Sequence, residues 1–174
     1  IIWLMELKRA HLVYFSPTST SKQVAEAIVH GTGIENISVT DITYRSPGKV
    51  NISRDTLTII AVPVYGGHVP PLAIQRLQDI TGDNASAVLV VVYGNRAYEK
   101  SLMELDQFAV QHGFPVIACA TFVGEHSFNT QANPISTGRP DAGDLELARQ
   151  FGHSISEKML SATDSESLYT VDVS

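Results

Sequence analysis

Residues 10–22 read Ala10-His-Leu-Val-Tyr-Phe-Ser-Pro-Thr-Ser-Thr-Ser-Lys22. The apolar run from Ala10 to Phe15 predicts a parallel strand that is covered on both faces. Five hydroxyl side chains then follow within six positions. The next segment, from about Thr20 to His30, carries apolar side chains every three or four residues, which predicts a helix. Strand, loop and helix in this order predict the first unit of an α/β sheet.

Four more segments predict strands, and helical patterns separate them. Three are near-continuous apolar runs, typical of parallel strands buried on both faces, whereas the fourth alternates and suits a sheet edge. The buried strands are Thr56–Val62, Ser86–Tyr93 and Pro115–Val123, and the edge strand is Asn36–Ile42. Five strands interleaved with helices predict a doubly wound, five-stranded parallel sheet in a single α/β domain.

The expected ends of the helices rest on glycine, proline and aspartate. Glycine commonly follows a helix, proline is tolerated in its first turn, and aspartate caps its N-terminus. The signals are Gly31 after the first helix, Pro70-Pro71 at the start of the second and Gly82 near its end, Gly113 after the third, and Asp144 at the start of the last.

The composition fits one globular domain, because 44% of the 174 residues are hydrophobic and only 17% are charged. We expect this domain to span residues 10–160, between an N-terminal extension (1–9) and a polar C-terminal tail (161–174). The only cysteine, Cys119, excludes a disulfide framework and a self-contained iron–sulfur cluster. The net charge of −6, without a basic run or a long apolar segment, predicts a cytoplasmic protein that binds no nucleic acid and no membrane.

Polar and glycine-rich segments follow four of the predicted strands. In an open α/β sheet, ligands bind beyond the carboxyl ends of the strands, so these segments are expected to lie together. They are Ser16–Lys22, Pro63–His68, Gly94–Tyr98 and Gly124–Phe128. Their convergence predicts a binding site at this end of the sheet.

The hydroxyl-rich segment precedes a helix whose first N–H groups lack partners and carry partial positive charge. Hydroxyls and N–H groups together can hold a phosphate without an arginine, and Lys22 adds one cation at the rim. Helix capping alone would need one such residue, whereas this segment supplies five. The Walker A pattern and the Gly-x-Gly-x-x-Gly fingerprint are both absent, which argues against a nucleoside triphosphate and against a Rossmann-type NAD site.

Aromatic residues beside glycines predict a place for a flat ligand. Tyr65 adjoins Gly66 and Gly67, which allow the backbone to approach a ligand closely, although the pair alone is also consistent with an ordinary turn. Tyr65 and Tyr98 could enclose a planar heterocycle, each by stacking.

The loop from Ser16 to Ser21 resembles the flavodoxin phosphate loop for flavin mononucleotide (FMN), which runs Ser/Thr-x-Thr-Gly-x-Thr. Over residues 12–158 the chain is also similar to the flavodoxin-like half of proteins fused to a ferredoxin domain with two 4Fe–4S clusters. Ser19 stands at the usual glycine position, and no cysteine cluster follows Ser161 in this sequence. The segments that carry the second resemblance are Val62–Pro71, Val91–Tyr98, Gly124–Phe128 and Gly138–Asp141.

The resemblance implies a flavodoxin-like sheet with strand order 2-1-3-4-5 and a site for one noncovalent FMN. It assigns three groups of residues to the cofactor. The phosphate would be held by Ser16, Thr18, Ser19, Thr20 and Ser21, one side of the isoalloxazine would be lined by Pro63, Val64, Tyr65, Gly66 and Gly67, and the pyrimidine edge would be covered by Tyr93, Gly94, Asn95, Arg96 and Tyr98.

The implied function is electron transfer, with the flavin cycling between oxidised, semiquinone and reduced states. The expected partner is a redox protein, of which a ferredoxin-type iron–sulfur protein is one kind, and the chain is expected to be a monomer or a homodimer. Two alternatives remain open: an NAD(P)H-dependent quinone or FMN reductase, and a non-redox interaction domain that has lost the cofactor.

Residues 124–140 form a 17-residue segment without periodicity, long enough to suggest a function. His126, Phe128 and Arg139 could close over the flavin or meet a partner, and an ordinary surface loop is equally consistent. We expect His68 and His126 to be structural or exposed to solvent, and no metal site is predicted.

Overall fold

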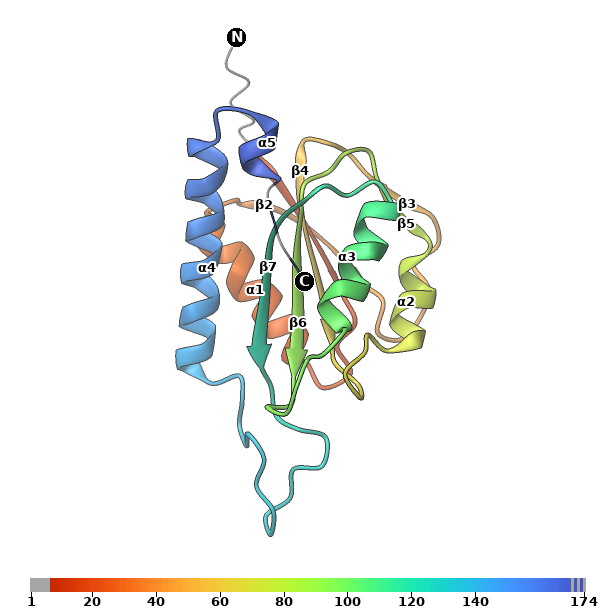
Figure 1. Cartoon of the computed structure of the whole chain (residues 1–174), viewed down its shortest axis with the longest axis vertical. Coiled ribbons are helices and arrows are strands. Elements are labelled where there is room, and N and C mark those ends of the chain that lie inside the picture. Colours follow the sequence, from red (N-terminus) through yellow and green to blue (C-terminus); the bar gives the residue numbers. More distant parts are fainter. Residues whose placement is uncertain (1–6, 170, 172, 174) are drawn as a thin grey trace.

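The computed structural model describes residues 7–169, 171 and 173 (Figure 1). Five parallel strands form one sheet in the order β2-β1-β4-β6-β7. These strands are β1 (Arg9–Tyr14), β2 (Asn36–Asp41), β4 (Thr56–Pro63), β6 (Ala87–Tyr93) and β7 (Val116–Val123). They are the five predicted strands. Two short additional strands take the numbers 3 and 5 along the chain, so this order is the predicted flavodoxin-like order 2-1-3-4-5, which is confirmed.

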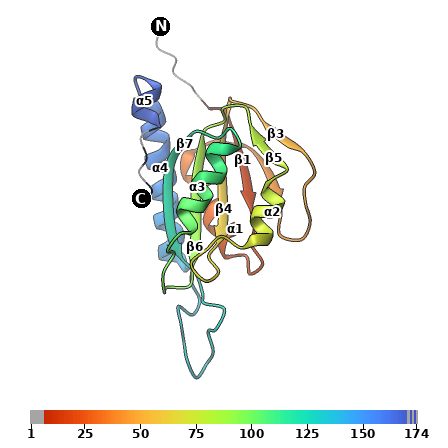
Figure 2. The same ribbon diagram turned by 45° about the vertical axis from the view of Figure 1, so that its right-hand side comes forward.

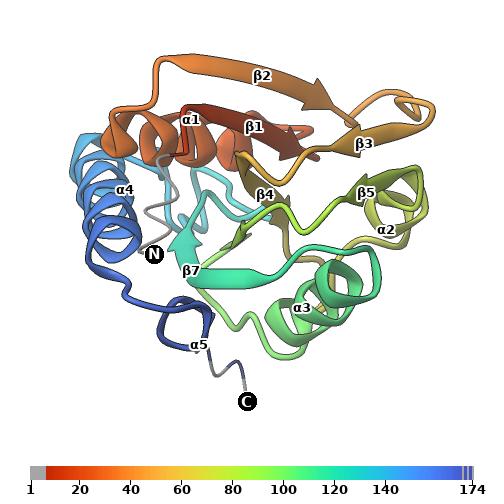
Figure 3. The ribbon, with the colours of Figure 1, turned by 90° about the horizontal axis from the view of Figure 1, so that it is seen from above.

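Helices cover both faces of the sheet (Figure 3). On one face lie α1 (Thr20–Thr32) and α4 (Ala142–Ser161), and on the other lie α2 (Pro71–Leu77) and α3 (Ser101–Gln111). The short α5 (Ser165–Leu168) follows α4 on the β7 side of the sheet (Figure 2). This is a doubly wound α/β domain.

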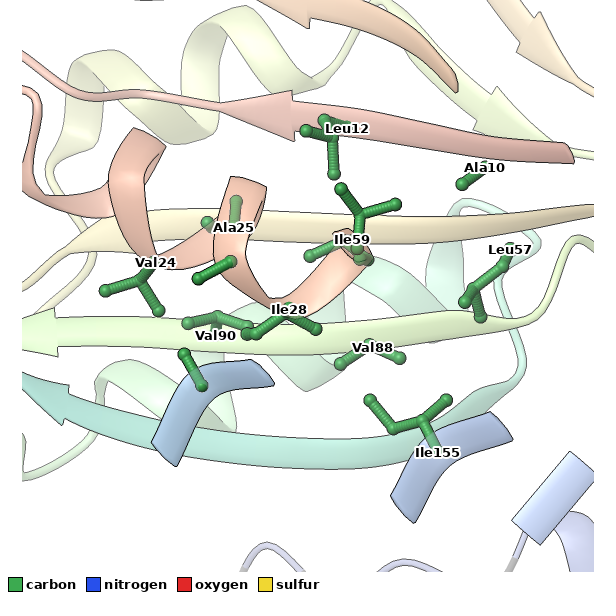
Figure 4. Packing of buried hydrophobic residues seen from close by; sticks show 14 of the residues in the cluster. Ala10, Leu12, Val24, Ala25, Ile28, Leu57, Ile59, Val88, Val90 and Ile155 are labelled. Atoms are coloured by element: carbon green, nitrogen blue, oxygen red, sulfur yellow. The ribbon is translucent and has the colours of Figure 1, made fainter. Parts of the chain in front are cut away.

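The sheet separates two hydrophobic clusters because successive side chains of a strand point to opposite faces. Leu12 and Ile59 belong to the cluster under α1 and α4, where Ile28 also packs (Figure 4). Their neighbours Val13 and Ile60 belong to the cluster under α2 and α3. All eight residues of β4 are buried, which explains its near-continuous apolar run.

Helix α1 continues through Gly31, where the sequence predicted its end. It stops instead at Gly33, which has a φ of 75° and donates its N–H to the His30 carbonyl. Gly31 serves helix packing: a Cβ there would lie 2.0 Å from the Arg149 carbonyl oxygen on α4. Gly152 on α4 allows the same close approach to the Ile28 carbonyl of α1. The expected stop at Gly31 was therefore wrong.

Helix α2 ends at Leu77, although the sequence predicted a helix that reaches Gly82. The segment Ile80–Gly82 forms strand β5 and pairs in parallel with β3 (Val50–Ile52) in a second, two-stranded sheet. Ile52 and Ile80 are both buried, so burial favours this pairing.

Asp141 rather than the predicted Asp144 is the N-cap of α4. Its carboxylate accepts the Asp144 N–H, and the Asp144 carboxylate accepts the Asp141 N–H in return, which makes a capping box. Asp144 also accepts two hydrogen bonds from the Arg139 guanidinium. The salt bridge with Arg139 holds the pKa of the Asp144 carboxyl below its usual range.

At the two ends of the chain, residues 1–6 of the predicted extension lie outside the described residues, and Arg9 already belongs to β1. In the predicted polar tail, Leu168 is buried in the α1–α4 cluster and Tyr169 packs against it. Among the residues that the structure describes, no helix has the length and apolar character needed to cross a membrane.

Candidate functional site

Four loops meet at the carboxyl ends of β1, β4, β6 and β7, at the lower end of Figure 1. Two hollows lie there. The polar pocket, of about 440 Å³, is lined by Thr18, Thr20, Gln23, Glu125, His126, Ser127, Asn129, Gly138, Arg139 and Pro140. The aromatic pocket, of about 380 Å³, is lined by Val64, Tyr65, Gly66, Gly67, Gly94, Arg96, Ala97, Glu99, His126, Ser127 and Phe128. His126 and Ser127 line both, so the two hollows adjoin.

A larger hollow of about 530 Å³ lies at the opposite end of the sheet, beside the start of β2 and the last turns of α1 and α4. In a parallel α/β sheet the loops that carry chemistry follow the carboxyl ends of the strands. Position and the nature of the lining groups therefore favour the polar and aromatic pockets over this hollow.

The hydroxyl loop (residues 16–21) turns from β1 into α1 through Ser19, which has a φ of 65° and a ψ of 1°. The Ser19 N–H donates to the Ser16 carbonyl at 3.1 Å. The Ser16 hydroxyl accepts the N–H of Lys22 at 3.0 Å. The structure thus accommodates a Cβ at the usual glycine position by holding an exposed serine in the left-handed conformation.

The start of α1 leaves several hydrogen-bond donors without partners. Within the described part of the chain, the N–H groups of Thr20 and Ser21 at the start of α1 have no hydrogen-bond partner. The Ser21 hydroxyl is also buried without a partner. A left-handed residue ahead of a helix groups N–H donors into an anion-binding nest. The loop fits an anion.

The charges around the hydroxyl loop are largely paired. Lys22 lies 3.9 Å from Glu26, and Arg139 is bound to Asp144. Glu125, in the polar pocket, accepts hydrogen bonds from the Gly138 N–H and from Asn129, which lower its pKa. An anion here would be held mainly by N–H groups, hydroxyls and the helix dipole.

The second loop makes a tight turn from Tyr65 to His68. The two residues exchange both backbone hydrogen bonds, at 2.9 and 3.2 Å. Gly66 and Gly67 between them have φ values of 60° and 83°. Positive φ at both central positions defines a type I′ turn, which favours glycine at each. The exposed Tyr65 ring stands beside this turn at the mouth of the aromatic pocket.

Neighbouring elements anchor the turn. Glu104 on α3 accepts hydrogen bonds from the His68 ring and from the Val69 N–H. The Gly67 carbonyl accepts the Lys100 N–H at 3.0 Å. The Glu99 carboxylate packs against Gly67 so closely that a Cβ there would lie 2.3 Å from it. The second and third loops therefore form one connected wall.

The third loop follows β6 and places its predicted residues unequally. Gly94 and Arg96 line the aromatic pocket, whereas Asn95, with a φ of 57°, is not among its lining residues. Tyr98 packs edge-on against Tyr93, with ring centroids 5.6 Å apart. Neither tyrosine lines the pocket. Pro63 is buried at the end of β4.

The long loop (residues 124–140) supplies a wall that the sequence left uncommitted. His126 is half-buried, its ring lies against Gly94, and a Cβ on Gly94 would lie 2.5 Å from His126 Cδ2. Phe128 packs its ring 5.3 Å from that of His126 and is 76% exposed. The sequence placed Gly124–Phe128 at this end of the sheet but assigned none of its residues to the cofactor. Glu99, six residues beyond the end of β6, also lines the aromatic pocket and was not assigned.

Two further observations concern metal ligands and the single thiol. Within residues 7–169, 171 and 173, no group of three or more His, Cys, Asp or Glu side chains is placed to hold a metal ion. Cys119 lies in β7, where burial, followed by the nearby Asp106 carboxylate, raises the pKa of its thiol to about 12. Its thiol is neutral and unsuited to nucleophilic catalysis at neutral pH.

Comparison with known proteins supports the fold. No protein-family model matches the chain, and no curated protein matches it in sequence. Among solved structures, oxidised flavodoxin 1 from Bacillus cereus is 17% identical with a TM-score of 0.58, over 83% of this chain and 94% of that one. A flavodoxin from Streptococcus pneumoniae TIGR4 is 17% identical with a TM-score of 0.56, over 86% and 99%.

A structure described as a flavone reductase is also similar, at 8% identity and a TM-score of 0.59. It matches over 88% of this chain, which spans only 63% of that protein. Identities this low establish a shared flavodoxin-like fold and no more.

Proposed function

We propose that this protein binds one FMN noncovalently and acts as a flavodoxin-like electron-transfer protein. The observation that carries the proposal is the hydroxyl loop: unpartnered N–H groups at the start of α1 and an orphaned, buried Ser21 hydroxyl. Buried polar groups are nearly always hydrogen-bonded, so a hydroxyl without a partner beside free N–H groups at a helix start supports a ligand there. A terminal phosphate would satisfy these donors together.

The aromatic pocket suits the flat part of the same molecule. It adjoins the polar pocket through His126 and Ser127, so a ligand with a phosphate at one end can reach both. Glycines at 66, 67 and 94 keep one side free of side chains, and Tyr65 offers a half-exposed ring. Stacking on such a ring is worth about 0.5–1.5 kcal/mol beyond the area buried.

When bound, the flavin supplies the redox chemistry, and the chain supplies binding, orientation and electrostatics. The hydroxyl loop would hold the phosphate, and Tyr65 would hold the ring plane. In flavodoxins a peptide of the corresponding turn reverses to meet the reduced ring, and in this chain the Gly66–Gly67 peptide suits that change. The change from type I′ to type II′ needs no new residue, since glycine accepts both signs of φ.

We propose that the physiological partner is a cytoplasmic redox protein with a basic face, and an iron–sulfur protein would meet this description. The net charge of −6 would attract such a face and speed the encounter. The exposed Tyr65 and Phe128 lie at the rim where it would dock.

Reconstitution tests the proposal. The purified chain is incubated with FMN and freed of unbound ligand by gel filtration, and its absorption spectrum is recorded. We expect one flavin per chain. A protein that elutes without flavin absorbance contradicts the redox proposal and leaves the non-redox interaction domain as the account to pursue.

A second candidate, an NAD(P)H-dependent quinone or FMN reductase, is favoured by one observation: the long loop lines both pockets and could enclose a small-molecule acceptor. The reconstituted protein would then oxidise NADPH with a quinone at catalytic turnover. An FMN-loaded protein that shows no such turnover is an electron carrier.

A further inference from the structure

We propose that the long loop forms a further wall of the flavin site, beside the hydroxyl loop and the wall made by the second and third loops. His126 is the hydrogen-bond donor of this wall and contacts the heterocycle through Nε2–H. This inference rests on the proposed function. It assigns a binding role to a loop that the chain could otherwise carry as a surface excursion (Figure 2).

His126 lies where the polar and aromatic pockets adjoin. Its ring packs against Gly94, just after β6. No residue larger than glycine fits at position 94, since a Cβ there would lie 2.5 Å from His126 Cδ2. The same side chain lines both the polar and the aromatic pocket. A group at the junction of two pockets faces any ligand that occupies both.

A backbone hydrogen bond determines which nitrogen of the His126 ring carries the proton. The Phe128 N–H donates to His126 Nδ1 at 3.0 Å, so Nδ1 must be the unprotonated nitrogen. In a neutral imidazole the proton then sits on Nε2, which makes that atom a donor. Among the described residues Nε2 has no hydrogen-bond partner. A flavin ring offers carbonyl oxygens and unprotonated ring nitrogens, which accept such a bond.

Hydrogen bonds within the long loop hold it in place without a ligand. The Glu125 carboxylate accepts the Gly138 N–H at 2.7 Å and the Asn129 amide at 3.0 Å. The side-chain amide oxygen of Asn129 accepts hydrogen bonds from the Ile135 N–H and the Thr137 hydroxyl, both at 2.7 Å. These bonds tie the two limbs of the loop together. A preformed wall avoids the entropy cost of ordering on binding, which favours affinity.

Three flavins and three variants test the contact. The apoprotein is titrated with FMN, riboflavin and lumiflavin, which lacks both phosphate and ribityl chain, and quenching of flavin fluorescence gives Kd. His126→Phe keeps a ring against Gly94 and removes the donor, and His126→Ala removes both. His153→Ala is the matched control, because His153 is exposed on α4 and lines neither pocket. Circular dichroism checks that each variant is folded.

For His126→Phe we expect all three flavins to bind roughly 2- to 12-fold more weakly, the effect of one neutral hydrogen bond. His126→Ala should weaken them further, and His153→Ala should change nothing. A loss confined to FMN would place His126 at the phosphate and overturn the ring contact. Unchanged Kd values in both His126 variants would also overturn it while leaving FMN binding intact. Failure of the unmodified protein to bind FMN would overturn the proposed function itself.

A second measurement needs no substitution. Long-range ¹H–¹⁵N spectra of the free protein should show His126 as the Nε2-protonated tautomer. Adding lumiflavin should shift the Nε2 resonance of His126 and leave that of His153 in place. A His126 ring that carries its proton on Nδ1, or that ignores lumiflavin, contradicts the proposal.

Discussion

The hydroxyl loop and the long loop both line the polar pocket but owe their shapes to different forces. The hydroxyl loop has only six residues, and the strand before it and the helix after it fix its course. Its internal bonds are Ser19 N–H to the Ser16 carbonyl and Lys22 N–H to the Ser16 hydroxyl. The long loop is much longer and depends on bonds between its own two limbs. The side chains of Glu125 and Asn129 make some of these bonds. The backbone makes others, from the Glu125 N–H to the Arg139 carbonyl and from the His126 N–H to the Ile135 carbonyl.

This difference predicts how each loop responds to the loss of a side chain. A loop fixed by its flanking elements keeps its shape when a side chain is removed, so substitutions there should act on the ligand. A loop whose limbs depend in part on two side chains loosens when either is removed or neutralised, so substitutions there should act on order first and on ligand binding second.

The largest expected effect is on the hydroxyl loop. Thr18→Ala combined with Ser21→Ala should weaken FMN at least roughly tenfold, since one hydrogen bond to a charged group is worth about 1.5–3 kcal/mol. Riboflavin, which lacks the phosphate, should bind as before. Fluorescence titration measures both, and equal weakening of the two flavins would contradict the assignment.

Ser21 allows a second readout in the same loop. Its hydroxyl is buried without a partner, so Ser21→Ala should not lower the free energy of unfolding of the apoprotein, and relief of the orphaned group should raise it. Thr58→Val is the matched control: Thr58 carries another orphaned buried hydroxyl, in β4, and this change should leave FMN binding unaltered. Urea denaturation gives the stabilities. A clear destabilisation by Ser21→Ala would show that its hydroxyl has a structural partner.

Removal of the Asn129 side chain should loosen the long loop. Asn129→Ala deletes the amide that Glu125 accepts and the acceptor of two further bonds. We expect proteolysis within residues 126–138 to accelerate, while FMN and riboflavin lose affinity equally, by a few-fold. Asn133→Ala is the control in the same loop, because only the backbone of Asn133 bonds to Thr130. Equal proteolysis of the two variants would contradict the role of Asn129.

The two loops should also differ in their response to acid. Hydrogen bonds from the Gly138 N–H and Asn129 lower the Glu125 pKa below its ordinary value of 4.5. The order this carboxylate provides is thus fully present above pH 4.5 and is lost as pH falls through the lowered pKa. NMR should show the Gly138 amide shifting in that range while the Thr20 amide stays constant, because residues 16–21 include no titratable side chain. Movement of both amides together would contradict the comparison.

The smallest effect concerns Ser19. Its left-handed conformation costs a residue with a Cβ roughly 1–2 kcal/mol, and glycine would remove that cost at some expense in unfolded-state entropy. Ser19→Gly should therefore raise the free energy of unfolding by at most about 1 kcal/mol and preserve FMN binding. A destabilised variant, measured in urea, would show that the serine side chain contributes something that the glycine lacks.

Much of the sheet could be predicted because long apolar runs are read directly from the chain. The predicted strands from Thr56 and Ser86 agree with β4 and β6 to within a residue. Strands β3 and β5 were missed because three residues are too short to show a period, and their pairing is a contact across 30 positions. Gly31 was misjudged because a glycine that ends a helix and one that admits a neighbouring helix look alike in sequence.

The site divides in the same way. The hydroxyl loop could be predicted because its chemistry is local: hydroxyls, a strand before and a helix after. The role of His126 could not, because it depends on the space above Gly94 and on the N–H of Phe128, which only the folded loop brings together. Tyr98 had a suitable residue type but turns to Tyr93.

The most direct test of the account is a crystal structure of the chain grown with FMN. We expect the phosphate to lie against the N–H groups of Thr20 and Ser21, and the ring to lie between Tyr65 and His126. A flavin bound elsewhere, such as in the larger hollow at the opposite end of the sheet, or a phosphate away from the hydroxyl loop, would contradict it.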